Sequence, residues 1–191
     1  MIATRDRLLA AATKLFAEVG FSAGSTDAVV RAAKVNKRMI YHYFGDKDGL
    51  AREVLSAQWQ AFAVSLAASQ WQSSAERALD TFFDFAVSHP DFLRLVMWDA
   101  LAGSLHSRAL WGNTRGPLFT QIVGMMTPGR KNAKQSDALA QTIISVLGAT
   151  AFYFAFAPSL ADVFRVDPLS PAALRRRRAH LHALLAHLTA R

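Results

Sequence analysis

Hydrophobic residues recur at three- and four-residue spacing through most of the chain, and this spacing predicts helices. In the first segment Leu8, Ala12, Leu15, Phe16 and Val19 fall on one face, and a glycine follows them directly. A glycine there can take the left-handed conformation of a helix C-cap, so the first helix is expected to end at residue 20. The sequence shows neither strand-like alternation nor an internal repeat, which predicts an all-α fold.

Two short helices separated by a three-residue break are expected next. Ser25 is a natural N-cap for a helix over Thr26–Ala33, and after a break at 34–36 a second short helix begins near Lys37. A long helix is expected over about Lys47–Ala68, capped by Asp46, and then a helix around Leu79–Val87, which Pro90 ends. Further helices are expected over Phe92–Leu101 and Arg115–Met126, followed by a solvated loop over Thr127–Gln135. An apolar helix starts at Ser136, and a last helix starts at Pro171, after the segment Ala157–Pro171.

The two short helices, packed against the longer helix before them, predict a helix-turn-helix. In that unit the second short helix enters the DNA major groove through its N-terminal residues, which here are Asn36, Lys37, Arg38 and Met39. Asn36 can cap the helix, while Lys37 and Arg38 can reach phosphates or guanine edges. One turn further on, the phenol of Tyr41 and the imidazole of His42 can donate to phosphate. Lys47 lies at the start of the long helix, where free backbone N–H groups favour an anion. The residues predicted to contact DNA are Ser25, Thr26, Lys34, Asn36, Lys37, Arg38, Met39, Tyr41, His42 and Lys47.

A surface that merely faces water explains each of these residues when it is taken singly. Taken together, the basic and aromatic groups gather at a helix start, whereas Val29, Val30, Val35 and Ile40 occupy the packing positions. That segregation favours a DNA-reading surface over an ordinary solvated one.

The segment LFAEVGFSAGSTDAVVRAAKVNKRMIYHYFGDKDGL resembles the N-terminal signature of the TetR family of transcriptional regulators. That signature has an LF…G helix end, a short helix, an AAGV turn and then Y.YF..K..L. The chain matches it at Phe16, Gly20, Ala32, Ala33, Val35, Tyr41, Tyr43, Phe44, Lys47 and Leu50. It departs at Lys34, where the family has glycine. A lysine enters the left-handed region at a cost of roughly 1 kcal/mol, so the turn is expected to be strained or differently shaped.

The resemblance is strong over residues 5–55 and architectural beyond them. It implies a three-helix DNA-binding domain over residues 1–48 and a larger helical domain over residues 49–191, which binds a small ligand and dimerises through its last two long helices. The implied function is that of a dimeric repressor, released from a palindromic operator by a small apolar ligand. An activator of the same fold, or a regulator that responds to no ligand, is the alternative.

The central region holds more large apolar side chains than a tight helical core needs, and pockets for drug-sized molecules are lined in this way. The residues predicted to line such a pocket are Phe82, Phe83, Phe85, Met97, Trp98, Trp111, Phe119, Met125, Phe152 and Phe156. Asp84, Arg94, Asp99 and His106 are polar groups close to this cluster in sequence, and any of them can orient a ligand. Packing in the core is the competing explanation for each aromatic residue taken singly.

Apolar residues at helical spacing on the last two long helices predict a four-helix interface between two subunits. The residues expected there are Leu139, Ile143, Val146, Leu147, Leu174, Leu181, Leu185 and Leu188. The run Arg175–Arg178 goes most of the way round one turn and is expected to be a solvated face, with a second DNA contact as the alternative. His180 and His182 lie on different faces and His187 lies too far round, so no metal site is expected.

The formal net charge of +8 is unevenly distributed. Residues 1–50 carry eight Lys and Arg against five Asp and Glu, residues 51–170 carry nine of each, and residues 171–191 carry five Arg and no acid. Most of the surplus lies in the tail, so net charge alone does not locate a DNA-binding face. The absence of cysteine excludes disulfides and thiolate metal sites. The N-terminus lacks the apolar core of a signal peptide, so a cytoplasmic location is expected.

Residues 139–157 are nearly all apolar and about as long as a bilayer span. A helical membrane-associated protein is therefore the alternative from a different class. Polar residues in the first half of the segment, and the lack of an aromatic belt at both ends, favour a buried helix, and no membrane partner is expected. No phosphate loop, carboxylate pair or nucleophile–histidine arrangement stands out, so neither an enzymatic activity nor a cofactor is expected.

Overall fold

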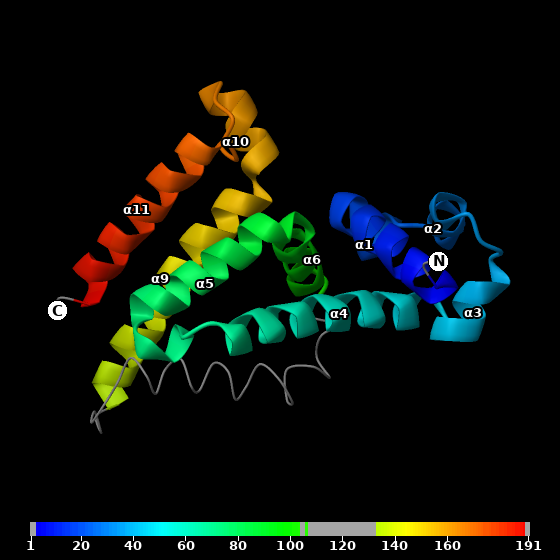
Figure 1. The fold of residues 1–191 in the computed structure, drawn as a ribbon, viewed down its shortest axis with the longest axis horizontal. Coiled ribbons are helices and arrows are strands. Elements are labelled where there is room, and N and C mark those ends of the chain that lie inside the picture. Colours follow the sequence, from blue (N-terminus) through cyan, green and yellow to red (C-terminus); the bar gives the residue numbers. More distant parts are fainter. Residues whose placement is uncertain (1–2, 104–105, 107–132, 190–191) are drawn as a thin grey trace. The chain divides into compact units, whose positions relative to one another are not determined.

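The computed structural model describes residues 3–103, 106 and 133–189, with side chains for all of these except 72 and 133–139. The secondary structure of these residues is helical, which confirms the predicted all-α fold (Figure 1). In chain order the elements are α1 (Thr4–Ala23), α2 (Thr26–Ala33), α3 (Arg38–Phe44), α4 (Lys47–Ala68), the short 3₁₀ helix η1 (Trp71–Ser73), α5 (Ala75–Ser88), α6 (Pro90–Leu101), α9 (Ala133–Ala155), α10 (Ala157–Phe164) and α11 (Pro171–Thr189). The helix predicted over Arg115–Met126 lies outside the described residues.

The chain divides into two compact units. The first takes its residues from Met1–Val64 and His89–Thr114, and the second from Ser65–Ser88 and Arg115–Arg191. The predicted boundary between a DNA-binding domain and a second domain at residue 48 concerns function as well as compactness, and it stays a prediction.

In the first unit α1, α2, α3 and the start of α4 enclose one apolar core. Its buried members are Leu8, Ala12, Phe16, Ala17, Phe21, Val29, Ala33, Ile40, Phe44, Leu50, Ala51, Val54, Leu55 and Leu95. Full burial of a Leu, Ile or Phe side chain stabilises a protein by about 1.5–3 kcal/mol. Because α3 contributes Ile40 and Phe44 to this core, its opposite side is left to face solvent.

Gly20 interrupts the first helix. It has φ 82 and ψ 167, which are not helical, and a further helical stretch follows the kink and ends at Ala23. The predicted break at residue 20 is therefore confirmed, although helical structure continues three residues beyond it. Phe21 packs back on Phe16, with ring centroids 5.3 Å apart.

Three polar side chains fix the starts of the next helices. Ser25, Asn36 and Asp46 accept backbone N–H groups through their side-chain oxygens, at 3.1, 2.9 and 2.6 Å respectively. Each satisfies a donor that the first turn of a helix leaves without a partner. These caps confirm the predicted starts of α2, α3 and α4.

Helix α6 belongs to the first unit, although it lies far along the chain from α1–α3. Leu95 of α6 has no exposed surface and is part of the core described above. Nε of Arg94 donates to the carbonyl oxygen of Ala17 at 2.9 Å, and Nε1 of Trp98 donates to the same oxygen at 3.3 Å. These two side chains satisfy backbone oxygens just before the kink in α1.

In the second unit α11 packs along α9 and α5. The rings of Phe83 on α5 and Phe154 on α9 meet edge to face, with centroids 5.2 Å apart. Helix α9 begins at Ala133, so the loop predicted through Gln135 was too long by three residues. The segment predicted between the last two long helices contains a further helix, α10, and the expected start of the last helix at Pro171 is confirmed.

The long apolar stretch is bent in the structure. Within the described residues no single helix is long and apolar enough to cross a membrane. One pair of helices, Ala140–Ala155 and Ala157–Phe164, reaches that length and composition together, but its two members meet at 74°.

Candidate DNA-binding site

The turn between α2 and α3 takes the strained form, which is one of the two outcomes expected from the sequence. Lys34 ends α2 with φ 54 and ψ 50, which is the left-handed region. Its backbone N–H donates to the carbonyl oxygen of Arg31, and the N–H of Val35 donates to that of Val30 at 3.1 Å. These bonds satisfy the last carbonyl groups of α2 in the manner of a helix C-cap. The lysine therefore takes the backbone conformation that the family's glycine would take, and its side chain is exposed.

The N-terminal turn of α3 presents most of the predicted DNA contacts to solvent. Asn36, Lys37, Arg38, Tyr41 and His42 are all exposed, and Tyr41 is 55% exposed. The start of α2 adds a further exposed hydroxyl, that of the N-cap serine. The structure thus brings the predicted residues of α2, the turn and α3 into one short motif.

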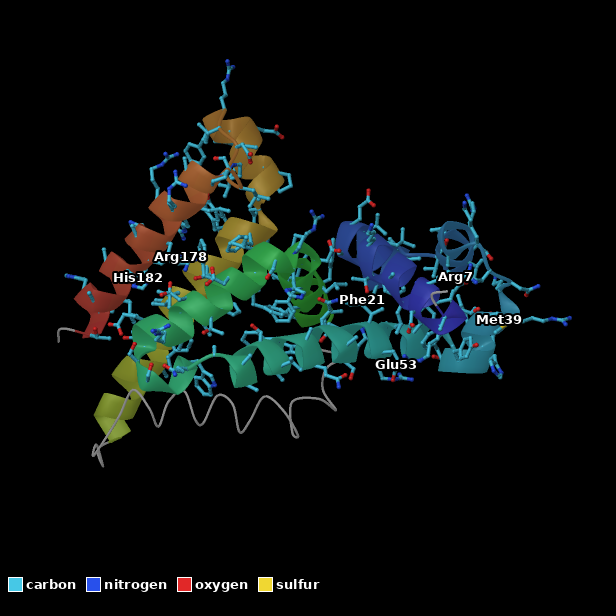
Figure 2. The ribbon with its side chains drawn as sticks, viewed as in Figure 1. Arg7, Phe21, Met39, Glu53, Arg178 and His182 are labelled. Carbon is cyan, nitrogen blue, oxygen red and sulfur yellow. The ribbon has the colours of Figure 1, made fainter. Side chains whose placement is uncertain are left out.

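Two of the predicted DNA contacts are less free than the sequence indicates. Met39 is only partly exposed, because it packs against the apolar core (Figure 2). Nζ of Lys47 donates to the carbonyl oxygen of Ser22 at 2.8 Å. This lysine therefore joins the start of α4 to the last turn of α1, besides any contact that it makes with DNA.

The side chains of Lys37 and Arg38, at the start of α3, differ in their surroundings. Nζ of Lys37 lies 2.8 Å from Oδ1 of Asp27, in the first turn of α2. The hydrogen bond to Asp27 raises the pKa of Lys37 above its ordinary value. The guanidinium of Arg38 has no hydrogen-bond or ion-pair partner among the described residues. The sequence predicted no role for Asp27, which joins the start of α2 to the start of α3 through this ion pair.

Contacts on the other side of α3 hold it in position. Arg5 of α1 lies over the ring of Phe44, 5.6 Å from its centroid, and forms an ion pair with Glu53 of α4. The start of α1, the end of α3 and the first turns of α4 are joined in this way. The reading helix is therefore supported by packing and charge together.

The residues predicted to line a ligand pocket are divided between the two units. Phe82, Phe83, Phe85, Phe152 and Phe156 lie in the second unit and Met97 and Trp98 in the first. Phe83 and Phe85 are buried, whereas Phe152 and Phe156 are about half exposed and stack on each other, with centroids 4.5 Å apart. Trp111, Phe119 and Met125 lie outside the described residues. The pocket stays a prediction.

The four polar residues named as possible ligand contacts all have partners within the protein. Arg94 donates to α1, as described above, and Asp84 forms an ion pair with Arg178. Asp99, which is 1% exposed, accepts the backbone N–H of His106 at 2.9 Å and lies 3.2 Å from its Nδ1. The ring of His106 packs on Phe21, with centroids 4.7 Å apart. These contacts provide a structural reason for each residue.

The apolar residues predicted at the dimer interface face inward in the protomer. Ile143, Val146, Leu181 and Leu185 are each less than a tenth exposed. A side chain already buried by its own chain has almost no surface to give to a partner, so these four positions are corrected to core residues. Leu147, Leu174 and Leu188 are partly exposed, and the side chain of Leu139 is outside the description. The helical spacing detected the buried face of each helix, which is the face that any packed helix has.

The arginine run is only half solvated. Arg175 and Arg176 are exposed, as expected. Arg177 donates to the carbonyl oxygen of Ala149 at 2.6 Å. Arg178 forms ion pairs with Asp80 and Asp84 of α5 and lies over the ring of Phe83, 4.8 Å from its centroid.

The histidines after the arginine run differ as well. His182 lies beside Arg178, with Nε2 2.9 Å from Oδ1 of Asp80 (Figure 2). His180 and His187 are exposed. The prediction of a solvated arginine face is therefore wrong for its second half, because one turn of helix necessarily points some of four consecutive residues inward.

The fold and this exposed reading helix define a helix-turn-helix regulator of transcription. Residues 8–54 match the family model described as "Bacterial regulatory proteins, tetR family", and residues 73–184 match the "Tetracyclin repressor-like, C-terminal domain". The second match covers more than half of the chain. The chain belongs to the TetR family of bacterial regulatory proteins, which are regulators of transcription rather than enzymes.

Individual relatives agree with this assignment. The chain is 32% identical over 160 residues to the HTH-type transcriptional repressor NicS of Pseudomonas putida, covering 79% of this chain and 74% of that protein. It is 31% identical over 99 residues to an HTH-type transcriptional repressor of Streptomyces coelicolor, of which it covers 50%. The fold is similar to that of a TetR-like transcriptional regulator from Rhodococcus sp. RHA1, with a TM-score of 0.69 and 22% identity over 98% of this chain and 97% of that one.

Proposed function

We propose that the protein is a dimeric repressor that binds a palindromic operator through α3 and is released from it by a small apolar ligand. The observation that carries the DNA-binding part is the exposed N-terminal turn of α3, where Arg38 projects without a partner among the described residues. A guanidinium in this position can donate two hydrogen bonds to O6 and N7 of guanine. Lys34, Tyr41 and His42 flank it as phosphate contacts. Bacterial DNA lies in the cytoplasm, so the protein is expected to work there.

The dimer is expected to form through α9 and α11, by their outward faces rather than by the leucines buried within the protomer. On α9 the outward face includes Ile144 and Phe152, which are 57% and 52% exposed. On α11 it holds Ala179 and Ala183, whose small side chains allow another helix to approach closely. A two-fold symmetric pairing of these faces would present two copies of α3. Two recognition helices must enter successive major grooves about 34–36 Å apart, which requires a palindromic site.

The ligand is expected to be mostly apolar and to carry little or no charge. Residues 51–170 hold equal numbers of basic and acidic groups together with most of the aromatic side chains, a composition that suits an apolar molecule better than a polyanion. A ligand shifts the equilibrium between two states only by the difference in its affinity for them. A 100-fold loss of operator affinity requires about 2.7 kcal/mol of such coupling, which is within the usual allosteric range.

The test of DNA recognition begins with selection of bound duplexes from a random library by the wild-type protein. A two-fold repeated sequence is expected, and recovery of only unrepeated sites would refute the palindrome. Arg38→Ala should then weaken binding to the selected duplex by roughly 1–3 kcal/mol and relax the preference at one base position, whereas loss of a phosphate contact at Lys34 should weaken all duplexes alike. Unchanged affinity in both variants would place the reading surface elsewhere.

Activation of transcription, or regulation without a ligand, uses the same DNA contacts. The sign of regulation is read from transcription of a reporter placed behind the selected operator, with and without the protein. Higher transcription in the presence of the protein would replace repression by activation and leave the DNA-binding proposal intact.

A further inference from the structure

An acidic residue lies within the reading surface, which is the surface proposed to contact DNA and is formed by the starts of α2 and α3 and the turn between them. Asp27 lies in the first turn of α2, and its side chain is 62% exposed. Its Oδ1 is 2.8 Å from Nζ of Lys37, the residue that directly precedes α3. The ion pair therefore joins the starting turns of the two helices that form the DNA-binding motif.

This pair competes with DNA for the charge of Lys37. An exposed ion pair is worth only about 0–1 kcal/mol, so a phosphate can displace the carboxylate. The energy lost when the pair breaks is nevertheless subtracted from the gain that Lys37 makes on phosphate. This loss acts on the contact with backbone charge, which is the same for every DNA sequence.

Arg38 is in the opposite situation. Its guanidinium is exposed, and no acidic side chain in the described part of the chain pairs with it. Arginine also has the planar geometry that matches the two acceptors of guanine, whereas lysine offers a point charge. The arrangement separates the two cations: Lys37 is held beside α2, and Arg38 is free to enter the groove.

We infer that Asp27 limits the affinity of the reading surface: by pairing with Lys37 it weakens the grip on the phosphate backbone of all DNA and leaves base recognition to Arg38. The inference rests on the proposed DNA contact by the start of α3. Non-specific binding is almost wholly electrostatic, so a weaker backbone grip reduces the amount of protein held on DNA outside the operator.

The experiment compares wild type with Asp27→Asn, Lys37→Gln and the double variant. The probes are the duplex selected by wild type and a scrambled duplex of the same length and composition, each titrated over a series of salt concentrations. Asp162→Asn is the charge-matched control, because Asp162 is an exposed acid on α10. Circular dichroism confirms that each variant is folded. Asp27→Ser serves as a second variant if the asparagine disturbs the start of α2.

Asp27→Asn should tighten binding to both duplexes by a similar factor and steepen the dependence of log Kd on log salt by about one unit. Between about 50 and 200 mM salt, one unit changes the ratio of mutant to wild-type Kd about four-fold. The gain should disappear in the Lys37→Gln background, and Asp162→Asn should match wild type.

Unchanged or weaker binding by Asp27→Asn would overturn the inference. So would a gain that persists without Lys37, because Asp27 would then act on phosphate directly. A wild-type protein that selects no sequence would instead refute the proposed function. Selective binding together with a neutral Asp27 would refute the inference alone.

Discussion

Replacement of Gly20 by alanine tests how α6 is joined to α1. Gly20 has φ 82 and ψ 167, a region that is essentially restricted to glycine. A Cβ atom built on it would lie 3.0 Å from Cδ2 and 3.1 Å from Cε3 of Trp98, on α6. The added methyl group therefore meets two obstacles, the backbone conformation and the indole ring.

The expected cost follows from these two terms. Backbone strain of this kind costs about 1–3 kcal/mol, and one extra carbon in a well-packed contact costs about 1–3 kcal/mol more. Alanine restricts the unfolded chain more than glycine does, which offsets about 0.4–1 kcal/mol. Gly20→Ala should thus lower the free energy of unfolding by about 1–5.5 kcal/mol.

A matched control separates the two terms. Gly45 also has a positive φ, 80°, but a Cβ atom there would meet nothing within 4 Å, so Gly45→Ala should report strain alone, about 1–3 kcal/mol. The second control is a double-mutant cycle with Trp98→Ala, which removes the ring that the methyl group meets. Urea unfolding followed by circular dichroism, at one fixed protein concentration because the protein is expected to dimerise, measures each variant.

Gly20→Ala should be more costly than Gly45→Ala, and it should be less costly in the Trp98→Ala background than in wild type. Equal costs for the two glycines, or a cycle in which the two changes at Gly20 and Trp98 are additive, would refute the steric role of Trp98. Loss of operator binding in Gly20→Ala at temperatures where the protein is folded would further show that this contact orients the reading helix.

Three further outcomes follow from the structure. Lys34→Gly should raise the free energy of unfolding by about 0.5–1 kcal/mol. Glycine takes the left-handed conformation without the strain of a lysine, and this gain is partly offset because glycine enlarges the unfolded ensemble. A loss of stability in urea unfolding would contradict this prediction. Arg178→Ala should lower the free energy of unfolding by about 0.5–1.5 kcal/mol, because it leaves Asp80 and Asp84 without the Arg178 cation. Arg176→Ala, at an exposed position, should stay within about 0.5 kcal/mol of wild type. Equal effects of the two substitutions would show that the ion pairs of Arg178 do not contribute to stability. The pKa of Glu76 is lowered, mainly by a hydrogen bond to its own backbone N–H and then by one to the Ser74 side chain. Its carboxylate therefore stabilises the protein at pH values above the ordinary pKa of glutamate. This contribution is lost as the pH falls through the lowered pKa. Glu76→Gln should therefore lower the urea midpoint at neutral pH and match wild type in acid, and a constant difference at all pH values would show that the carboxylate charge is not the cause.

Much of the DNA-binding motif was predictable because its determinants are local. An N-cap, a left-handed turn residue or a helix start depends on side chains within a few residues, and the caps at Ser25, Asn36 and Asp46 are of this kind. For Lys34 the turn signature left two outcomes, a strained left-handed lysine or a differently shaped turn, and the structure has the first. The bounds of α2 and the start of α11 were predicted correctly for the same reason.

Other predictions failed where the sequence pattern does not say which neighbour a helix has. Ile143 and Val146 on α9, with Leu181 and Leu185 on α11, mark a buried face. Periodicity is the same whether that face packs on its own chain or on a partner. The arginine run shows the same limit, since the inward direction of Arg178 depends on α5, about a hundred residues earlier. The ion pair of Lys37 was likewise not predicted, because its partner Asp27 lies on another helix.

The sequence by itself determined that the chain is helical, where the reading helix begins and which family the motif resembles, because propensity, capping and turn geometry act over a few residues. Only the tertiary structure decided that α6 supports the DNA-binding unit through Arg94, Leu95 and Trp98, that Asp27 holds Lys37, and which faces of the last helices are left for a partner. These facts arise from contacts between segments far apart in the chain, whose geometry is set by the packing of the whole core.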